Sequence, residues 1–435
     1  MKSGGDQALN VYLRTNLVGR LWLDNGRRFA FRYDPAWLDR EDAVPLSLKL
    51  PLQSAPFEDD LARPFFANLL PESELRRAIA RRLGLSEQND FALLEAVGGE
   101  CAGAVSLLPA DTPVSGEGSY RALNDDALNA LVADLPKRPM LAGEQDIRLS
   151  LAGAQNKLPV HFDGHTISLP MGAAPSSHIL KPPIPRYPDS VYNEAFCMEL
   201  AERVGLSVPT VTLLQKQQPL YLIERYDRRR SPDGRLERVH QEDFCQALGI
   251  PPDQKYEKEG GPGLEPCFDL LRAESVVPVA DVRALLHWVI FNYLIGNADA
   301  HGKNIALLLA DGGPHLAPFY DLMSTAVYPD LADRLAMGIG GEDRPDWVIA
   351  RRWEQFADDV GIQFKLVRQT LVHMKELVSD AAGELAREFQ ARHGPCDVVD
   401  RILGVIEARR NKITQALTAA DKASDASGGR TTPTE

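Results

Sequence analysis

The sequence predicts an α+β protein that is β-rich toward its N-terminus and mostly helical toward its C-terminus. Short β-type runs separated by turn signals such as Asp24-Asn25-Gly26 recur early in the chain, whereas apolar residues recur at helical spacing after Asp243. The chain has 435 residues, of which 44% are hydrophobic and 25% charged, as in an ordinary globular protein. At roughly 150 residues per domain, this length predicts two or three folding units.

The first part is expected to be a β-rich subdomain over residues 1–110. A small meander of strands comes first, followed by a helix at 72–85 and a second helix that contains the apolar run 91–94, which follows capping residues. The strands of the meander are expected at residues 9–13, 19–23 and 28–33.

A new pattern of strands begins after a stretch at 109–119 that is rich in Pro, Gly and small polar residues. We therefore expect a connector at 111–146 and a lobe at 147–226, in which a helix at 191–205 ends at a glycine. The strands of this lobe are expected at residues 147–151, 157–162, 176–181, 208–214 and 221–226.

The C-terminal part, residues 227–417, is expected to be a mostly helical lobe with two apolar stripes. The tail at 418–435 contains no large apolar residue, and we expect it to be disordered. The two stripes consist of Phe364, Val367, Leu371 and Met374, and of Val399, Ile402, Ile406, Ile413 and Leu417.

Charge and composition exclude several classes of protein. The 48 Lys and Arg residues against 61 Asp and Glu residues give a net charge of −13, which argues against binding nucleic acid by bulk electrostatics. The basic run at 225–230 could touch DNA, but a solvated strand end is the favoured interpretation. No apolar run reaches the roughly 18 residues of a membrane span, and no signal-peptide core is found. The five cysteines form no CxxC pair, so a cytoplasmic location fits best.

The segment NADAHGKN contains the chemistry. Asp299 and Asn304 fill the D-x-x-x-x-N spacing of a kinase catalytic loop, in which the Asp takes the hydroxyl proton and the Asn binds a metal ion. Asp321 follows a short apolar strand and a tight turn, where a carboxylate would chelate Mg²⁺. An isolated D-x-x-x-x-N occurs by chance, but this order of helix, loop, strand, turn and second Asp favours phosphoryl transfer.

The other parts of a kinase can be sought upstream. Lys181 ends an apolar strand and is the candidate to bind the ATP phosphates. Either Glu194 or Glu199 on the next helix is the candidate to orient that lysine. The hinge to the adenine would be Glu224, Arg225 and Tyr226. The phosphate loop departs from the pattern, because the turn from Ser150 to Lys157 has small residues but no GxGxxG. Together these features predict a two-lobed, protein-kinase-like fold.

These residues resemble the HipA family, the serine/threonine kinase toxins of bacterial toxin–antitoxin systems. The resemblance covers nearly the whole chain except the tail, with many strings in the same order. The strings are PLSLKLPL, FFANLLPE, GGECAGAVSLLP, RLSLAGAQNKLPV, SSHILKP, NEAFCMELAERVGLSVP, YLIERYDRR, RVHQEDFCQALG, KYEKEGGPG, NADAHGKNIALLL and LAPFYDLMST.

The resemblance implies roles for individual residues and partners. It makes Asp299 the catalytic base, Asn304 and Asp321 the ligands of Mg²⁺, and Ser150 a site of autophosphorylation whose charge switches the enzyme off. It also implies an aminoacyl-tRNA synthetase as protein substrate and a small helix-turn-helix antitoxin that supplies DNA binding. A scaffold or co-repressor role, and a small-molecule or lipid kinase, stay open as alternatives. The expected ATP contacts are Ala152, Gly153, Ala154, Gln155, Asn156, Lys157, Lys181, Glu224, Arg225, Tyr226, His301, Gly302, Lys303, Asn304, Tyr320 and Asp321.

Overall fold

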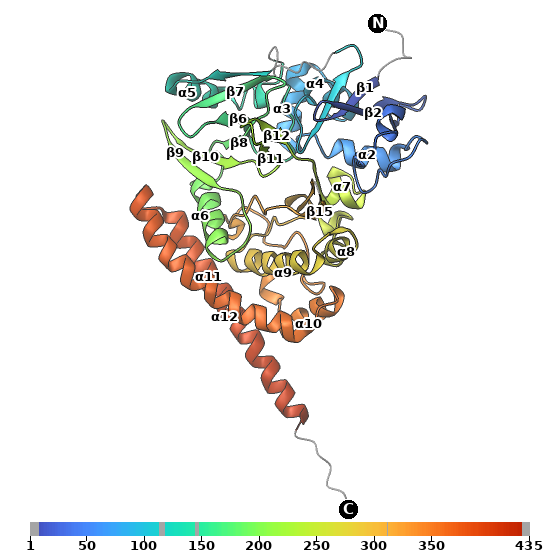
Figure 1. The fold of residues 1–435 in the computed structure, drawn as a ribbon. Coiled ribbons are helices and arrows are strands. Elements are labelled where there is room, and N and C mark those ends of the chain that lie inside the picture. The colour runs from blue at the N-terminus through green and yellow to red at the C-terminus, as the bar shows by residue number, and fades with distance from the viewer. Residues whose placement is uncertain (1–7, 113–117, 144–147, 311, 429–435) are drawn as a thin grey trace, which may run out of the picture. The chain divides into compact units, whose positions relative to one another are not determined.

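The strands and the long helices fall into two compact units in the computed structural model, which describes residues 8–112, 118–143, 148–310 and 312–428. Both units are assembled from separate stretches of chain (Figure 1). The α+β class is confirmed, with strands in the first unit and long helices in the second. The first unit comprises Met1–Pro185, Pro209–Lys255 and Ile305–Ala317, and the second comprises Arg186–Val208, Tyr256–Asn304 and Pro318–Glu435.

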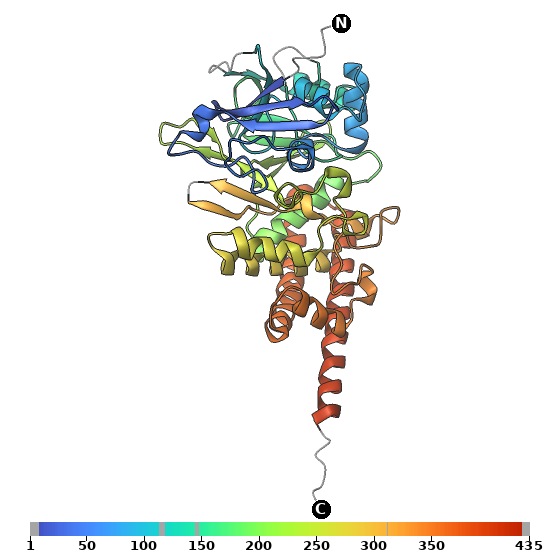
Figure 2. The same ribbon diagram turned by 90° about the vertical axis from the view of Figure 1, so that its right-hand side faces the viewer.

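The predicted N-terminal meander is a four-stranded antiparallel sheet in the order β3-β2-β1-β4. Its strands β1 and β2 lie side by side (Figure 2). The sheet consists of β1 (Ala8–Leu13), β2 (Asn16–Leu23), β3 (Phe29–Tyr33) and β4 (Val105–Pro109). The helices between β3 and β4 are α1 (Pro35–Leu38), α2 (Asp59–Ala67), α3 (Ser73–Leu83) and α4 (Asp90–Val97).

A second, six-stranded sheet has the order β5-β7-β6-β8-β10-β9. Lys181 on β8 lies opposite Tyr221 on β10. The strand expected at 147–151 is wrong for its described residues, because Leu149 forms only an isolated bridge to Glu100. The elements are β5 (Gly118–Ala122), α5 (Asp125–Asp134), β6 (Leu158–Phe162), β7 (Ile167–Gly172), β8 (His178–Lys181), β9 (Val211–Gln215) and β10 (Pro219–Glu224).

Two smaller sheets complete the first unit. Strands β11 (Arg228–Arg230) and β12 (Leu236–Arg238) form a short ribbon. A three-stranded sheet in the order β13-β14-β15 follows, and α7 (Phe244–Leu248) begins directly after its first strand. Its strands are β13 (Gln241–Asp243), β14 (Ala306–Ala310) and β15 (Gly313–Leu316).

One apolar core joins the two large sheets of the first unit. It contains Val11 and Phe31 from the four-stranded sheet together with Val160 and Leu180 from the six-stranded sheet. Leu128, from the predicted connector, belongs to the same cluster. The division of the chain therefore differs from the boundaries expected from the sequence, because described residues of the expected connector, such as Leu128, belong to a shared core instead of separating two domains.

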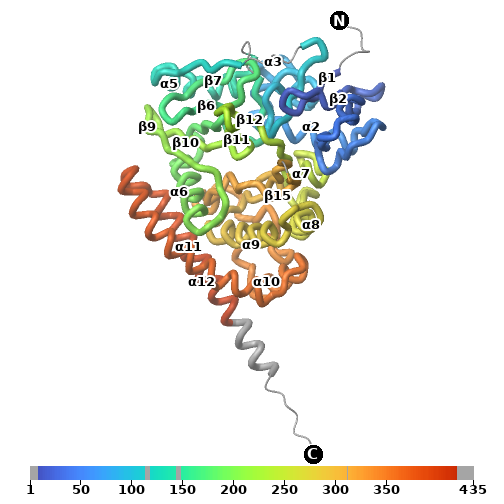
Figure 3. The backbone as a smooth tube through the Cα atoms, viewed as in Figure 1, coloured from blue at the N-terminus to red at the C-terminus, as the bar shows by residue number. Residues whose placement is uncertain are grey.

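The second unit is helical, as predicted for the C-terminal part. Helices α11 and α12 pack against each other (Figure 1), and the predicted apolar stripes on them are largely buried. Figure 3 shows the backbone path through helices α11 and α12. The helices are α6 (Ser190–Arg203), α8 (Leu264–Glu274), α9 (Pro278–Ile295), α10 (Ala350–Asp359), α11 (Phe364–His393) and α12 (Asp397–Gly428).

The end of α12 corrects one prediction. The helix continues to Gly428, so disorder is wrong for residues 418–428, whose alanine-rich composition favours helix. The remaining predicted tail, 429–435, lies outside the described residues. Within the described part of the chain, no helix is both long and apolar enough to cross a membrane.

Candidate active site

The predicted catalytic loop begins where the buried helix α9 ends. Gly296 caps the helix in the left-handed conformation (φ 70°) and donates from its N–H to carbonyls of the last turn. A Cβ on this residue would lie 2.6 Å from the Val405 side chain and 2.8 Å from Ala326. Only glycine satisfies both the conformation and the close packing, so the chain leaves the helix at a defined point.

A chain of side-chain amides leads from α9 to Asp299. Asn297 Nδ2 donates to Asn292 Oδ1 at 2.7 Å, and the Asp299 N–H donates to Asn297 Oδ1 at 3.1 Å. Asn292 and Asn297 are buried, whereas Asp299 is exposed. The backbone of the predicted base is therefore anchored to the helix while its carboxylate is accessible to an acceptor.

The two predicted metal ligands belong to segments that contact each other. Asn304 Oδ1 accepts from the His301 N–H at 3.1 Å, which closes the loop around residues 301–304. The Tyr320 hydroxyl donates to the Lys303 carbonyl at 2.5 Å and ties the segment before Asp321 to this loop. Asp321 itself has φ 54°, a conformation rare outside glycine and concentrated at functional sites.

The oxygen chemistry of these two residues fits Mg²⁺. Magnesium ions in kinases are held by few protein oxygens together with phosphates and water. Asn304 and Asp321 offer one amide and one carboxylate. The described residues contain no group of three or more His, Cys, Asp or Glu side chains that could hold a metal ion by themselves. A metal ion held by these two residues would need further oxygen ligands, such as phosphate or water.

The predicted phosphate loop is bonded to the segment between helices α2 and α3. The Glu72 N–H donates to the Gly153 carbonyl at 3.1 Å, and Lys157 Nζ donates to the Ala152 carbonyl at 2.5 Å. Gly153 has φ 103°, and a Cβ there would lie 2.6 Å from Lys157 Nζ. The positive φ favours glycine at this turn, whereas the end of the flexible lysine side chain could shift.

Ser150, the predicted autophosphorylation site, is fully buried in this structure. Its hydroxyl donates to the Leu69 carbonyl at 2.8 Å, and its N–H donates to the Glu100 carbonyl at 2.9 Å. A phosphate group has no room in such a position, so the loop has to leave it before Ser150 can accept one.

Lys181 and the two candidate glutamates differ in their surroundings. Lys181 is buried at the end of β8, and its ammonium group lies 5.5 Å from the centre of the Tyr221 ring. Glu199 forms an ion pair with Arg392 of α11, whereas Glu194 is buried on the same helix. Whether either glutamate orients Lys181 stays a prediction.

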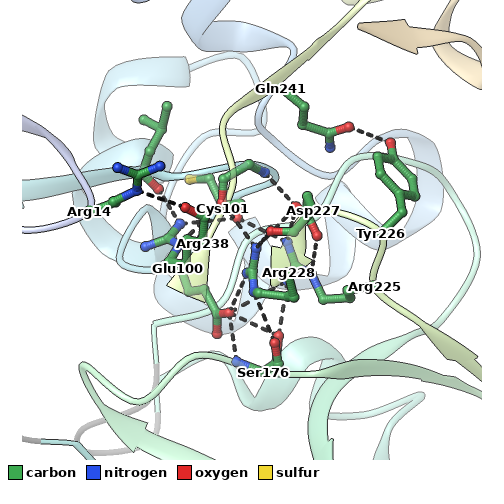
Figure 4. A network of polar contacts seen from close by, with 12 residues as sticks. Arg14, Glu100, Cys101, Ser176, Arg225, Tyr226, Asp227, Arg228, Arg238 and Gln241 are labelled. Atoms are coloured by element: carbon green, nitrogen blue, oxygen red, sulfur yellow. Dashed lines mark hydrogen bonds and ion pairs between the residues drawn. The ribbon is translucent and has the colours of Figure 1, made fainter. Parts of the chain in front are cut away.

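The predicted hinge borders a cluster of buried charges, defined here as Glu100, Arg225, Asp227 and Arg228 (Figure 4). Arg225 donates to both carboxylate oxygens of Asp227, at 2.9 and 2.7 Å. Arg228 donates to Glu100 at 2.8 Å. These contacts link the Gly-Gly-Glu loop after α4 to the strand end after β10.

This cluster corrects the interpretation of the basic run at 225–230 for Arg225 and Arg228, whereas Arg229 and Arg230 are exposed as predicted. The side chains of Arg225 and Arg228 are 2% and 1% exposed, so they are neither solvated nor available to DNA. The N–H groups of Glu224 and Arg225 donate to the carbonyls of Thr210 and Ser177. Contacts of Glu224, Arg225 and Tyr226 with a nucleotide stay a prediction, in which Arg225 would not use its side chain.

Electrostatics explains why the cluster is stable as ions. Burial opposes ionisation of Asp227, but Arg225 and Arg228 outweigh it and hold the pKa of this carboxyl well below its usual range. The pKa of Glu100 is lowered by the same balance, in which burial is offset mainly by Arg228. Burial also lowers the pKa of the nearby His240 to about 4.

The structure also reveals a residue that the sequence reasoning missed. The Tyr256 hydroxyl donates to Asp299 Oδ1 at 2.7 Å, and its ring packs edge-on against His301 at 5.3 Å. Tyr256 lies in the string KYEKEGGPG, which contributes to the family resemblance. Nothing in its local pattern indicates a contact with residues so far along the chain.

Comparisons with known proteins agree with this geometry. The chain matches the HipA N-terminal domain over residues 9–108 and the HipA-like C-terminal domain over residues 149–385. The protein named "Putative kinase Y4mE" from Sinorhizobium fredii is 43% identical over 388 residues, which cover 88% of this chain and 92% of the relative.

Two further matches come from Shewanella oneidensis. The serine/threonine-protein kinase toxin HipA is 31% identical over 399 residues, which cover 88% of this chain and 90% of the toxin. The solved structure of HipA in complex with HipB and operator DNA has a TM-score of 0.80 and 29% identity, and the match covers 94% of this chain and 99% of that chain. The likeness thus extends over both units.

Proposed function

This chain belongs to the HipA family of kinases, and from that membership we propose that it transfers the γ-phosphoryl group of Mg-ATP to serine or threonine hydroxyls of proteins. The observation that most supports the proposal is the loop from Asn297 to Asn304. It presents one exposed carboxylate from a buried, hydrogen-bonded frame. A general base requires this combination of access and fixed position.

In this proposal Asp299 accepts the proton of the serine or threonine hydroxyl. The hydroxyl oxygen bonds to the γ-phosphorus while the bond from the γ-phosphorus to the β–γ bridging oxygen breaks, and ADP leaves. Asn304 and Asp321 would hold Mg²⁺, which would supply positive charge to the phosphate oxygens. Lys181 binds the phosphates. The remaining contacts with ATP are proposed for Ala152, Gly153, Ala154, Gln155, Asn156, Lys157, Glu224, Arg225, Tyr226, His301, Gly302, Lys303 and Tyr320.

Ser150 is proposed as the site of autophosphorylation and of switching. Its burial supports a phosphate loop that is closed only while the serine is unmodified. A phosphoserine would bring close to two negative charges and three oxygens that need partners. The loop could not return to the Leu69 carbonyl, so phosphorylation would turn the enzyme off.

For partners we propose a small helix-turn-helix antitoxin, with DNA bound only through it. The Shewanella oneidensis HipA was solved together with HipB and operator DNA, and the net charge of −13 in this chain argues against direct DNA binding. An aminoacyl-tRNA synthetase is proposed as the protein substrate, by resemblance to the family.

The test is phosphorylation of the purified full chain with labelled ATP and Mg²⁺. We expect the native chain to carry label on Ser150. In Ser150→Ala the peptide that contains residue 150 should be unlabelled, and Asp299→Asn should carry no label anywhere. The exposed carboxylate variant Asp333→Asn is the matched control and should label as the native chain does. Equal labelling of Asp299→Asn and the native chain would contradict the assignment of the base.

The same assay separates the alternatives. A scaffold or co-repressor would bind an antitoxin normally and show no transfer from ATP under any condition. A small-molecule or lipid kinase would transfer phosphate to such acceptors and leave protein hydroxyls unlabelled.

A further inference from the structure

Tyr256 contacts the carboxylate that the proposed mechanism uses as its base. Its hydroxyl donates to Asp299 Oδ1 at 2.7 Å, and both residues belong to the second unit. Asp299 is exposed and Tyr256 is half-buried, so the contact leaves the carboxylate open to solvent. We infer that Tyr256 is a positioning residue that fixes the orientation of the base, an inference that rests on the proposed function.

The tyrosine is held by the turn that follows it. The N–H groups of Glu259 and Gly261 both donate to the Tyr256 carbonyl at 2.9 Å, and Gly260 closes the turn with φ 95°. The ring is further restrained by its edge-on packing against His301. The hydroxyl is therefore presented from a fixed backbone and not from a freely rotating side chain.

The next residue connects this turn to the catalytic loop. The Glu257 N–H donates to the Ala336 carbonyl at 3.2 Å, and Glu257 Oε2 accepts from the Gly338 N–H at 2.6 Å. The Ala336 N–H in turn donates to the Ala298 carbonyl at 2.9 Å. Ala336 thus lies between the two segments and bonds to both.

These contacts mount the tyrosine and the base on one hydrogen-bonded frame. Three segments far apart in the sequence take part, around residues 256–257, 336–338 and 298–299. A frame of this kind sets the distance between the Tyr256 hydroxyl and Asp299 independently of any substrate. Groups that orient a catalytic side chain in this way allow it to meet the acceptor without a search among rotamers.

The geometry favours positioning over blocking. A carboxylate has two oxygens, and the tyrosine uses Oδ1, while the side chain of Asp299 stays exposed. The second oxygen can accept the proton of a serine or threonine hydroxyl while the tyrosine remains bound. A blocking tyrosine would instead have to leave before each reaction, and its removal would accelerate the enzyme.

The test compares Tyr256→Phe with the native full chain in the same phosphorylation assay. Two quantities are measured: the rate at which label from ATP appears on the protein at saturating Mg-ATP, and the Mg-ATP concentration that gives half this rate. We expect the saturated rate to fall roughly 10- to 100-fold, as for other residues that orient a functional group. The half-saturating concentration and the thermal midpoint should stay at their native values.

The matched control is Tyr328→Phe, which removes a tyrosine hydroxyl bonded to the Pro188 carbonyl in the same unit. It should keep the native rate. A native or higher rate in Tyr256→Phe would overturn the inference. If Asp299→Asn is inactive in that case, the proposed function survives. If Asp299→Asn is active as well, the assignment of the base fails and the inference fails with it.

Discussion

Two polar regions of this molecule use charge in opposite ways. In the cluster of Glu100, Arg225, Asp227 and Arg228, the ions are buried and bonded to one another. In the catalytic loop, neutral amides are buried and the single carboxylate of Asp299 is exposed. A high number of charged residues in one region of this protein therefore does not indicate a catalytic site. A charge whose partners are other protein ions stabilises the fold, whereas a charge on a neutral frame is available to a substrate.

The comparison is tested most strongly at Asp299. Asp299→Asn removes the proposed base and keeps the size of the side chain, so the rate of phosphoryl transfer should fall about 10²- to 10⁴-fold. The free energy of unfolding should hardly change, because the carboxylate is exposed. Kinetic assays and urea denaturation of the same preparation measure both quantities. A large loss of stability would mean that the charge of Asp299 stabilises the fold, as the charges of the buried cluster do.

Asp227→Asn should show the opposite pattern. It leaves Arg225 and Arg228 buried without a full counter-charge, and breaking a buried pair in this way costs about 3–5 kcal/mol of stability. Urea denaturation of the full chain gives this value. A variant as stable as the native chain would mean that solvent reaches the cluster, and the contrast with Asp299 would disappear.

His240 extends the comparison to acid pH. Its Nε2 lies 2.8 Å from the Leu46 carbonyl, and burial lowers its pKa from 6.5 to about 4. The unfolded chain therefore takes up a proton between these values that the folded chain does not, so stability is complete above pH 6.5 and falls as the pH drops toward 4. The loss from this residue should approach roughly 3 kcal/mol.

The measurement is the free energy of unfolding as a function of pH. His240→Gln keeps an N–H donor but cannot titrate, so the slope between pH 6.5 and 4 should decrease by about one proton. Part of the slope should remain, because burial also lowers the pKa of His178 to about 4. An unchanged slope in His240→Gln would show that His240 is protonated in the folded protein.

The sequence predicts the local features of both regions and misses the distant ones. The strands of the meander and the helix before the catalytic loop follow from apolar spacing, and Asp299, Asn304 and Asp321 follow from the order of short elements around them. The expected strand at 147–151 fails because its described part bridges Glu100 instead of a neighbouring strand. Partners distant in the chain leave no trace in local periodicity.

The same limit explains the basic run and Tyr256. Four of the six residues at 225–230 are arginines against one aspartate, and such a basic run is typical of a solvated surface. Besides Asp227 within the run, Arg228 pairs with Glu100, which belongs to the N-terminal sequence. Tyr256 is equally distant from Asp299. A single sequence contains both partners of each contact but not the information that they meet.

The smallest effect is expected at the exposed end of the same basic run, where Arg229 pairs with Glu237 at 3.2 Å. Their side chains are 50% and 42% exposed. Glu237→Gln should cost less than about 1 kcal/mol, because water screens the pair and replaces its hydrogen bonds. Added salt should abolish even this difference, while the effect of Asp227→Asn should persist. Urea denaturation at low and high salt compares the two variants. Equal losses in both would mean that burial does not separate structural from solvated charge in this segment.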